Sequence, residues 1–244
     1  MHLLPSHQIE ARPVYKVMIT IFHIFYNQHE MLKKHYTAWS QHPKNMFKYI
    51  IVDDCSPRVV SEKCNIDSVS IYRVKQDIPW NIAGARNLGF HVASTDWVLG
   101  ADVDHIVTTE AAEKLHSLDL SKPNRAYTFR RISKKDGYEG CPAIINILMN
   151  KKKFFEIGGY DEDFSGNYGR EETFFRRCLR KHSIEVIQCD HIVLDWYPKH
   201  GATSGLKRDK TVNSEIFNKK MSELNDGTYK NGLILRFAWE KLFL

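Results

Sequence analysis

The sequence lacks the features that mark membrane-spanning, secreted and disulfide-bonded chains. No apolar run in its 244 residues is long enough to cross a bilayer. Residues 1–13 lack a basic region followed by an apolar block, so we expect no signal peptide. The five cysteines form no Cys-x-x-Cys pair, and such an odd, scattered set indicates reduced thiols. We therefore expect a cytoplasmic protein with no transmembrane segment.

The sequence also lacks a nucleic-acid recognition motif, and its basic residues are dispersed, so we expect no nucleic-acid partner. The net charge of +6, with His neutral, favours acidic partners such as nucleotides, phosphates or an anionic membrane face. Aromatic residues make up 12% of the chain, which argues against disorder. The length suits one sizeable domain or two small ones.

The first half alternates apolar strands with helices. We predict strands over Val14–Phe25, Phe47–Val52, Val69–Val74 and Trp97–Ala101, and helices over Glu30–Trp39 and Ala83–Ala93. Short buried strands that alternate with helices imply an α/β fold, with a mostly parallel sheet and helices on both faces. Ligands of such sheets bind beyond the carboxyl ends of the strands.

The second half follows a different pattern. We predict antiparallel strands over Ala126–Ile132 and Ala143–Met149, helices over Lys151–Ile157 and Glu171–Lys181, and a strand-rich segment over Ile184–Trp196. The chain ends in an amphipathic segment, Leu233–Leu244. We predict it to be a helix that docks on the domain, and a peripheral contact with a membrane surface is the alternative.

Two acidic pairs lie at predicted strand ends. Asp53-Asp54 follows the second strand and Asp102-Val103-Asp104 follows the fourth, so the fold places both pairs in one crevice. If the strand persists through Asp104, the carboxylates of Asp102 and Asp104 point the same way. Such a pair can hold one hard divalent cation, and the cation can hold a diphosphate. Taken alone, either pair is better explained as a polar turn.

Four segments nevertheless follow one another in an order that favours a binding site: Ile50–Ser56, Ala85–Gly89, Asp102–Asp104, and Gly158–Glu162 followed by Tyr168–Glu172. Their order and spacing resemble family 2 and related inverting glycosyltransferases of the GT-A fold, over roughly Val14 to His200. The last segment resembles the C-terminal motif of the galactosyltransferase group. The resemblance implies a mostly parallel central sheet flanked by helices, with a smaller antiparallel sheet on the acceptor side. It implies a single domain over residues 1–244, with a donor half (14–105), an acceptor half (106–205) and a helical tail (206–244).

The resemblance also implies roles for the matching residues. Asp54 contacts the nucleobase or its ribose, and Arg86 lies near the base and the diphosphate. Asp102 reaches the ribose, and Asp104 binds Mn²⁺ or Mg²⁺. Glu171 contacts the acceptor, and Glu172 is the general base. The other expected donor contacts are Asp53, Tyr26, Trp80 and Asn81. The other expected acceptor contacts are Gly159, Tyr160, Asp161 and Tyr168.

Three departures from the family pattern bear on these roles. After the first strand, only Tyr26 and Asn27 of the usual Pro-x-Tyr-Asn remain. The acidic pair at the start of the predicted helix Glu171–Lys181 is Glu-Glu instead of Glu-Asp. The glutamate side chain is longer than that of aspartate by about one C–C bond, which matters because proton transfer requires the carboxylate to lie within hydrogen-bond distance. His200 is the expected histidine that completes the metal site, with Asp195 and His191 as the alternatives.

The resulting prediction is an inverting, metal-dependent glycosyltransferase. Its partners would be a nucleotide-sugar donor, with UDP as the expected nucleotide, and a carbohydrate or glycoconjugate acceptor. A sugar nucleotidyltransferase would need a glycine-rich phosphate loop near the first strand, and Val17–Gln28 contains no glycine. A dinucleotide oxidoreductase is disfavoured because Gly84–Gly89 lacks the middle glycine of Gly-x-Gly-x-x-Gly. A non-catalytic carbohydrate- or nucleotide-binding protein with the same fold stays open as an alternative.

Overall fold

The computed structural model describes residues 17–60, 69–198, 207–230 and 234–243. The strands are β1 (Ile19–Phe25), β2 (Phe47–Asp53), β3 (Val69–Val74), β4 (Trp97–Asp102), β5 (His105–Ile106), β6 (Arg125–Ser133), β7 (Glu139–Gly140), β8 (Ile147–Asn150), β9 (Glu185–Trp196) and β10 (Trp239–Leu242). The helices are α1 (His29–Gln41), α2 (Ile82–Val92), α3 (Thr109–Leu115), α4 (Lys151–Glu156), α5 (Glu171–Lys181) and α6 (Thr211–Asp226), with a 3₁₀ turn η1 (Glu162–Phe164). Among these described helices, none is long and apolar enough to cross a bilayer.

The described strands form one mixed sheet in the order β10-β3-β2-β1-β4-β8-β6-β9-β5, with β7 beside β6. The strands β1 to β4 pair in parallel, as predicted. The strand β8 runs antiparallel to both β4 and β6. The expected smaller antiparallel sheet is therefore not a separate sheet, because β8 pairs directly with β4 and continues the central ladder of hydrogen bonds.

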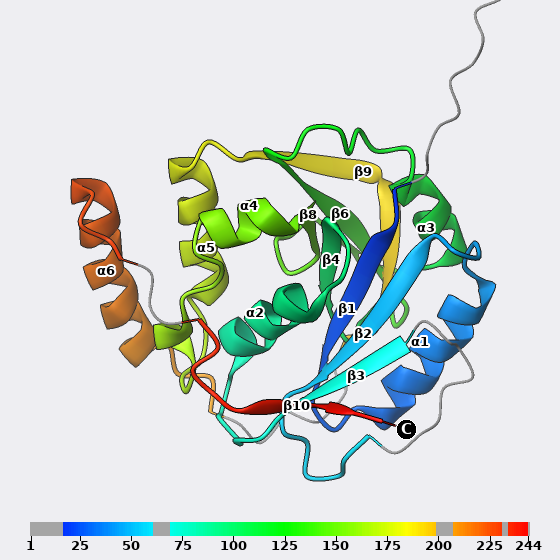
Figure 1. The fold of residues 1–244 in the computed structure, drawn as a ribbon, viewed down its shortest axis with the longest axis horizontal. Coiled ribbons are helices and arrows are strands. Elements are labelled where there is room, and N and C mark those ends of the chain that lie inside the picture. Colours follow the sequence, from blue (N-terminus) through cyan, green and yellow to red (C-terminus); the bar gives the residue numbers. More distant parts are fainter. Residues whose placement is uncertain (1–16, 61–68, 199–206, 231–233, 244) are drawn as a thin grey trace, which may run out of the picture.

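Helices cover both faces of this sheet (Figure 1). The helices α1 and α3 pack on one face and α2, α4 and α5 on the other, each group over its own hydrophobic cluster. The helix α2 lies unusually close to the sheet because Gly89 leaves room for the ring of Phe22. A Cβ atom added at Gly89 would lie 2.4 Å from that ring. This close packing holds α2, which carries Arg86, against the strands that lead to the acidic pairs.

The prediction of a helix over Leu233–Leu244 is wrong. Within this segment Trp239–Leu242 forms β10, which pairs antiparallel with β3. Without it, β3 would present a row of unpaired N–H and C=O groups at the sheet edge. The ring of Trp239 packs edge-on against Tyr72, with 5.9 Å between ring centroids. The helical face on which a membrane-surface contact depended is therefore absent, and the helical part of the tail is α6.

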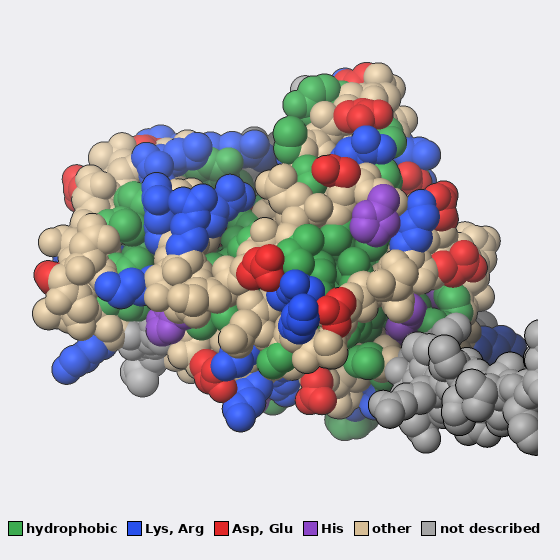
Figure 2. Space-filling view, turned by 90° about the horizontal axis from the view of Figure 1, so that it is seen from above, with side chains coloured by type: hydrophobic (Ala, Val, Ile, Leu, Met, Phe, Trp, Pro, Cys, Tyr) green, Lys and Arg blue, Asp and Glu red, His purple; other side chains and the backbone are tan. Residues whose placement is uncertain are grey.

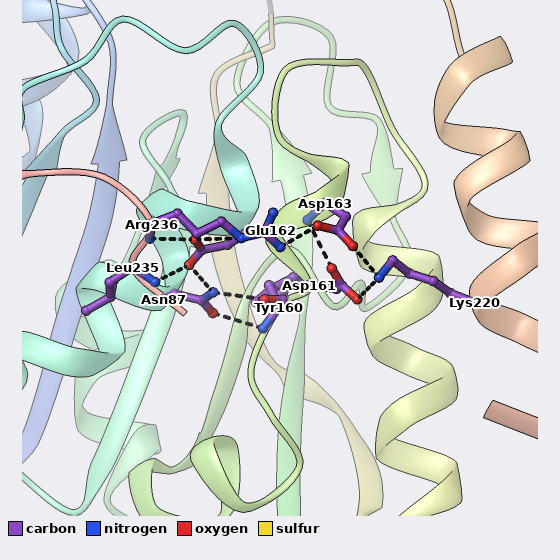
Figure 3. A network of polar contacts seen from close by, with 8 residues as sticks. All are labelled: Asn87, Tyr160, Asp161, Glu162, Asp163, Lys220, Leu235 and Arg236. Carbon is purple, nitrogen blue, oxygen red and sulfur yellow. Dashed lines mark hydrogen bonds and ion pairs between the residues drawn. The ribbon is translucent and has the colours of Figure 1, made fainter. Parts of the chain in front are cut away.

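Glu162 in η1 lies at the centre of a buried polar network that attaches this C-terminal segment (Figure 3). Its carboxylate is 2% exposed. It accepts hydrogen bonds from the Asn87 side-chain amide at 2.8 Å, the Leu235 backbone N–H at 2.7 Å and the Arg236 backbone N–H at 3.0 Å. Asp161 and Asp163 extend the network to α6 through Lys220, at 2.7 and 2.6 Å.

The network yields a stability prediction. In Glu162→Gln one carboxylate oxygen is replaced by an amide NH₂, which faces backbone N–H donors and leaves them without an acceptor. We expect a loss of about 2 kcal/mol or more of unfolding free energy and a fall in Tm of about 4–8 °C by thermal denaturation. Glu215→Gln, at an exposed position of α6, is the matched control. Equal Tm values for the two variants would contradict the prediction.

Candidate active site

A cavity of about 550 Å³ opens beyond the carboxyl ends of β1, β2 and β4, where the sequence placed both acidic pairs. Its wall includes Tyr26, Asp54, Asp77, Trp80, Asn81, Asp102, Asp104, Tyr168, Arg170, Glu171, Glu172, Arg208 and Lys210. A larger hollow of about 960 Å³ lies between α1, α3 and β9 and contains neither acidic pair. The smaller cavity is the candidate active site because it is where the acidic groups converge.

The candidate metal ligands are Asp102, Asp104 and His105. The strand β4 ends at Asp102, so the strand does not persist through Asp104, and a turn brings the second carboxylate back. One ligand atom from each of the three residues lies within 4.8 Å of the others. His105 was not among the metal ligands predicted from the sequence. Its position directly after the Asp-x-Asp motif was the feature of the sequence that could have indicated this role.

The two described alternatives for completing the metal site, Asp195 and His191, do not join this group. His200 lies outside the described residues. The Asp195 carboxylate pairs with the Lys134 ammonium at 3.3 Å and lines the larger hollow. The His191 side chain is exposed on β9. Among the described residues, the third ligand atom comes from His105.

The Asp104 carboxylate is held in its ionised form. Burial by itself would raise its pKa, but His105 Nδ1 at 2.7 Å and the Trp196 indole N–H at 3.1 Å outweigh burial and hold the pKa below the usual value. The turn is supported from behind by His35 of α1, whose ring Nε2 lies 2.8 Å from the Val103 carbonyl oxygen. Two carboxylates and an imidazole suit Mn²⁺, and the oxygens alone suit Mg²⁺. The residues therefore fit the expected cation.

Arg86 lies behind the cavity and joins its two acidic groups. The side chain is almost fully buried. Its guanidinium lies 2.8 Å from Asp102 Oδ1 and 3.0 Å from Glu172 Oε1, and it donates a hydrogen bond to the Tyr160 hydroxyl at 2.8 Å. Burial opposes its charge, but Tyr160 and the two carboxylates raise the pKa of Arg86 well above the usual value. In this structure Arg86 holds the acidic groups in place, and its contact with a nucleotide stays a prediction.

Glu171 and Glu172 open α5 at the edge of the cavity. The two residues before them, Gly169 and Arg170, have φ angles of 83° and 78°, and this left-handed turn directs the start of α5 into the cavity. Burial raises the pKa of Glu172 to about 7, the charges of Asp102 and Glu171 add to the rise, and Arg86 opposes it. Burial also raises the pKa of Glu171. Glu172 is thus half-buried, close to a cation and able to exchange a proton near neutral pH.

The Asp53-Asp54 pair divides between two environments. Asp54 lines the cavity, accepts a hydrogen bond from the Asn81 amide at 2.9 Å, and has its pKa raised to about 8 by burial. Asp53 is fully buried, accepts the Ser56 backbone N–H at 2.8 Å and pairs with Arg73. The donor contact predicted for Asp53 is not possible from this position, because its carboxylate closes the turn after β2 and lies outside the cavity wall.

The acceptor contacts predicted for Gly159, Tyr160 and Asp161 also lie outside the cavity wall. Gly159 lies in the turn that follows α4, in the left-handed region with φ 63°. Tyr160 is 1% exposed and stacks on Phe175 with 4.1 Å between ring centroids. The Asp161 side chain is fully buried and serves the polar network of Figure 3. Of the predicted acceptor contacts, Tyr168 and Glu171 line the cavity, with Tyr168 beside Trp80.

Known proteins resemble this chain in sequence. The glycosyl transferase family 2 model matches residues 20–179. An uncharacterized glycosyltransferase of Haemophilus influenzae is 30% identical over 108 residues, which make up 44% of this chain and 36% of that protein. The match thus spans about a third of that relative's length.

Solved structures resemble it in fold. The structure of S. aureus TarS in complex with UDP-GlcNAc has a TM-score of 0.68 and 12% identity, over 89% of this chain and 68% of that one. GalNAc-T7 with UDP, GalNAc and Mn²⁺ has a TM-score of 0.69 and 12% identity, over 88% of this chain and 50% of that one. A mannosyltransferase from Pyrobaculum calidifontis with GDP-Man and Mn²⁺ has a TM-score of 0.55 and 13% identity, over 79% and 60%. With more than half of its length matched by the family model, this chain belongs to glycosyltransferase family 2 and has the GT-A fold.

Proposed function

We propose that this protein is an inverting, divalent-metal-dependent glycosyltransferase that moves a sugar from a nucleotide-diphosphate donor to a hydroxyl of a carbohydrate acceptor. The observation that carries the proposal is the guanidinium of Arg86, which lies 2.8 Å from Asp102 and 3.0 Å from Glu172. It connects the candidate metal cluster to the candidate base across one cavity. UDP is the expected nucleotide, and two of the three structures named above contain UDP or a UDP-sugar.

Two neighbouring groups of cavity residues are suited to the two parts of the transfer. At the strand ends, Asp102, Asp104 and His105 would hold a divalent cation that acts as a Lewis acid and neutralises the departing diphosphate. At the start of α5, Glu172 would accept the proton of the acceptor hydroxyl, and its pKa of about 7 matches that task. The oxygen would then form its bond to the anomeric carbon on the face opposite the departing diphosphate. Attack from that face inverts the anomeric centre.

Thermal stability with nucleotide and Mn²⁺ tests the metal and donor site. A ligand that binds only the folded state raises Tm by mass action, about 5 °C or more at 100 times its Kd. We expect a shift that requires both UDP and Mn²⁺ and that disappears in Asp104→Asn, because the amide weakens cation binding. The control is Asp190→Asn, at an exposed position of β9. If Asp104→Asn shows the wild-type shift, or if no nucleotide with Mn²⁺ shifts the wild type, the proposal fails.

A further inference from the structure

A rim of cations and aromatic rings lies at the mouth of the cavity. The rings of Trp80 and Tyr168 pack against each other at a tilt of 59°, with 4.7 Å between centroids. The guanidinium of Arg208 lies 5.8 Å from the Trp80 ring and 5.7 Å from the Tyr168 ring, and the ammonium of Lys210 lies 5.5 Å from the Tyr168 ring. Arg170 lines the same cavity. We call Arg170, Arg208 and Lys210 the cationic rim.

The three cations of the rim are exposed to solvent and accessible to a ligand. All three side chains are exposed, and in the part of the chain that the structure describes none of them forms an ion pair with a carboxylate. The lysines of the larger hollow differ, since the Lys114 ammonium pairs with Glu110 at 2.6 Å. Like charges gathered at one cavity favour an anion between them.

The rim segment is also held in place. Trp80 donates its indole N–H to the Lys207 carbonyl oxygen at 3.0 Å, which fixes the backbone that precedes Arg208. The Trp80 backbone has a φ of 53°, an unfavourable conformation for a bulky residue, and such strain is concentrated at functional sites. On the other side, Arg170 donates a hydrogen bond to the Ser214 hydroxyl of α6 at 3.1 Å. The cations are therefore positioned before any ligand arrives.

The rim lies on the acceptor side of the cavity. Arg170 directly precedes Glu171 and Glu172 in sequence, and the charge of Lys210 acts on the Glu171 carboxylate. The diphosphate of a donor would lie at Asp102 and Asp104 instead, where a cation would bind it. An acceptor whose hydroxyl reaches Glu172 extends from there toward the rim.

We propose that the acceptor is an anionic carbohydrate, a sugar phosphate or a uronate, whose charge is bound by Arg170, Arg208 and Lys210 and whose ring stacks on Trp80 and Tyr168. Guanidinium and ammonium groups form charge-assisted hydrogen bonds with phosphate and carboxylate. Aromatic faces are suited to the apolar side of a sugar ring. This inference rests on the proposed transferase function and narrows its substrate class. It assigns Trp80, which the resemblance implied to be a donor contact, to the acceptor instead.

Further basic residues continue along the exposed side of α5, which begins at the candidate catalytic pair. They are Arg176, Arg177, Arg180 and Lys181. Figure 2 shows lysine and arginine side chains gathered on the left of the molecule, the side on which Figure 1 shows α5 and α6. Over its 11 residues α5 rises about 16 Å. An acceptor with several anionic groups would therefore meet positive charge beyond the rim.

The test compares charged and neutral acceptors in wild type and in the double variant Arg208→Gln/Lys210→Gln. Methyl glucoside and methyl galactoside are each compared with their 6-phosphates and uronates, and nucleoside diphosphate release is measured from UDP-sugars with Mn²⁺. We expect kcat/KM to be at least about tenfold higher for an anionic form in the wild type. The double variant is expected to lose about tenfold of that preference, and added salt to weaken it. Lys44→Gln/Lys152→Gln removes two exposed charges far from the cavity and is the matched control.

If none of these sugars is an acceptor, a measurement of sugar binding still tests the inference. Methyl glucoside and its 6-phosphate are compared by saturation-transfer NMR on the protein loaded with UDP and Mg²⁺, and the 6-phosphate is expected to bind only with the rim intact. Equal binding or turnover of neutral and anionic forms overturns the inference and leaves the transferase proposal standing. The inference is also overturned if the double variant loses as much affinity for UDP–Mn²⁺ as it loses in kcat/KM for the anionic acceptor. The rim would then bind the donor diphosphate. Absence of any nucleotide–Mn²⁺ binding in the wild type contradicts the transferase proposal itself.

Discussion

The Glu172→Gln variant is expected to bind UDP and Mn²⁺ and to lose sugar transfer by about 10³-fold, within the range that a general base contributes. The amide has the shape of the carboxylate and keeps an oxygen for the contact with Arg86, which is 3.0 Å in the wild type. It cannot accept a proton from the acceptor hydroxyl. The rate of transfer under single-turnover conditions measures the loss, and the nucleotide–Mn²⁺ thermal shift shows that the donor site is intact.

The pH dependence of the same reaction gives an independent check. Burial raises the pKa of Glu172 to about 7, so at lower pH the carboxyl group is protonated and cannot act as a base. We expect kcat/KM to fall about tenfold per pH unit below this pKa and to level off above it. A bound cation lowers the pKa of Glu172, so the fall begins at pH 7 or below. The acid limb is expected to be absent from the residual activity of Glu172→Gln.

Glu113→Gln, at an exposed position of α3, is the control for this variant. It makes the same chemical change far from the cavity and is expected to keep the wild-type rate and pH profile. Full activity of Glu172→Gln, with its fold intact, would remove Glu172 from the role of base.

The second large effect is expected for Arg86→Met, which removes a buried cation that lies between two carboxylates. Asp102 and Glu172 would then face each other without compensation, and breaking a buried ion pair in this way costs about 3–5 kcal/mol. For a chain of this length the loss corresponds to a fall in Tm of about 6–20 °C. Denaturant unfolding at pH 8 measures the free energy directly.

The sign of the pH effect distinguishes charge repulsion from lost packing. The pKa of Glu172 is raised above its usual value by burial, so its proton is held more tightly in the folded state. Arg86 lowers the pKa of Glu172 in the wild type, so in the variant Glu172 binds its proton at a higher pH still, and protonation removes one of the two opposing charges. The destabilisation in Arg86→Met is therefore expected to shrink from pH 8 to pH 5. Arg177→Met, at an exposed position of α5, is the control. A loss that is equal at both pH values would assign the effect to packing alone.

Much of this site could be predicted from local sequence. The apolar strands alternating with helices place the acidic residues at carboxyl strand ends, and Asp54, Asp102 and Asp104 do line one cavity. Glu172 follows from the motif before α5 and lies in the same wall. These predictions succeed because the periodicity of a strand or helix and its end are properties of short segments.

Other features depended on which segments meet in space. The final segment is a strand because β3 offers a free edge, and the amphipathic pattern of the segment gives no sign of that edge. Asp53 and Asp54 are neighbours in sequence, yet one closes a turn and the other lines the cavity. Whether a carboxylate serves the fold or the site depends on the partner that faces it.

The strand ends, the Asp-x-Asp motif and the family could thus be inferred from the order of residues alone, since each depends on contacts within a few positions along the chain. The links from Arg86 to Asp102 and Glu172, and the cationic rim formed by Arg208 beside Trp80, exist only in the folded chain. Trp80 and Arg208 come from loops more than a hundred residues apart. Contacts over such separations are determined by the packing of α2 and α5 on the sheet and of α6 on α5, which no local pattern encodes.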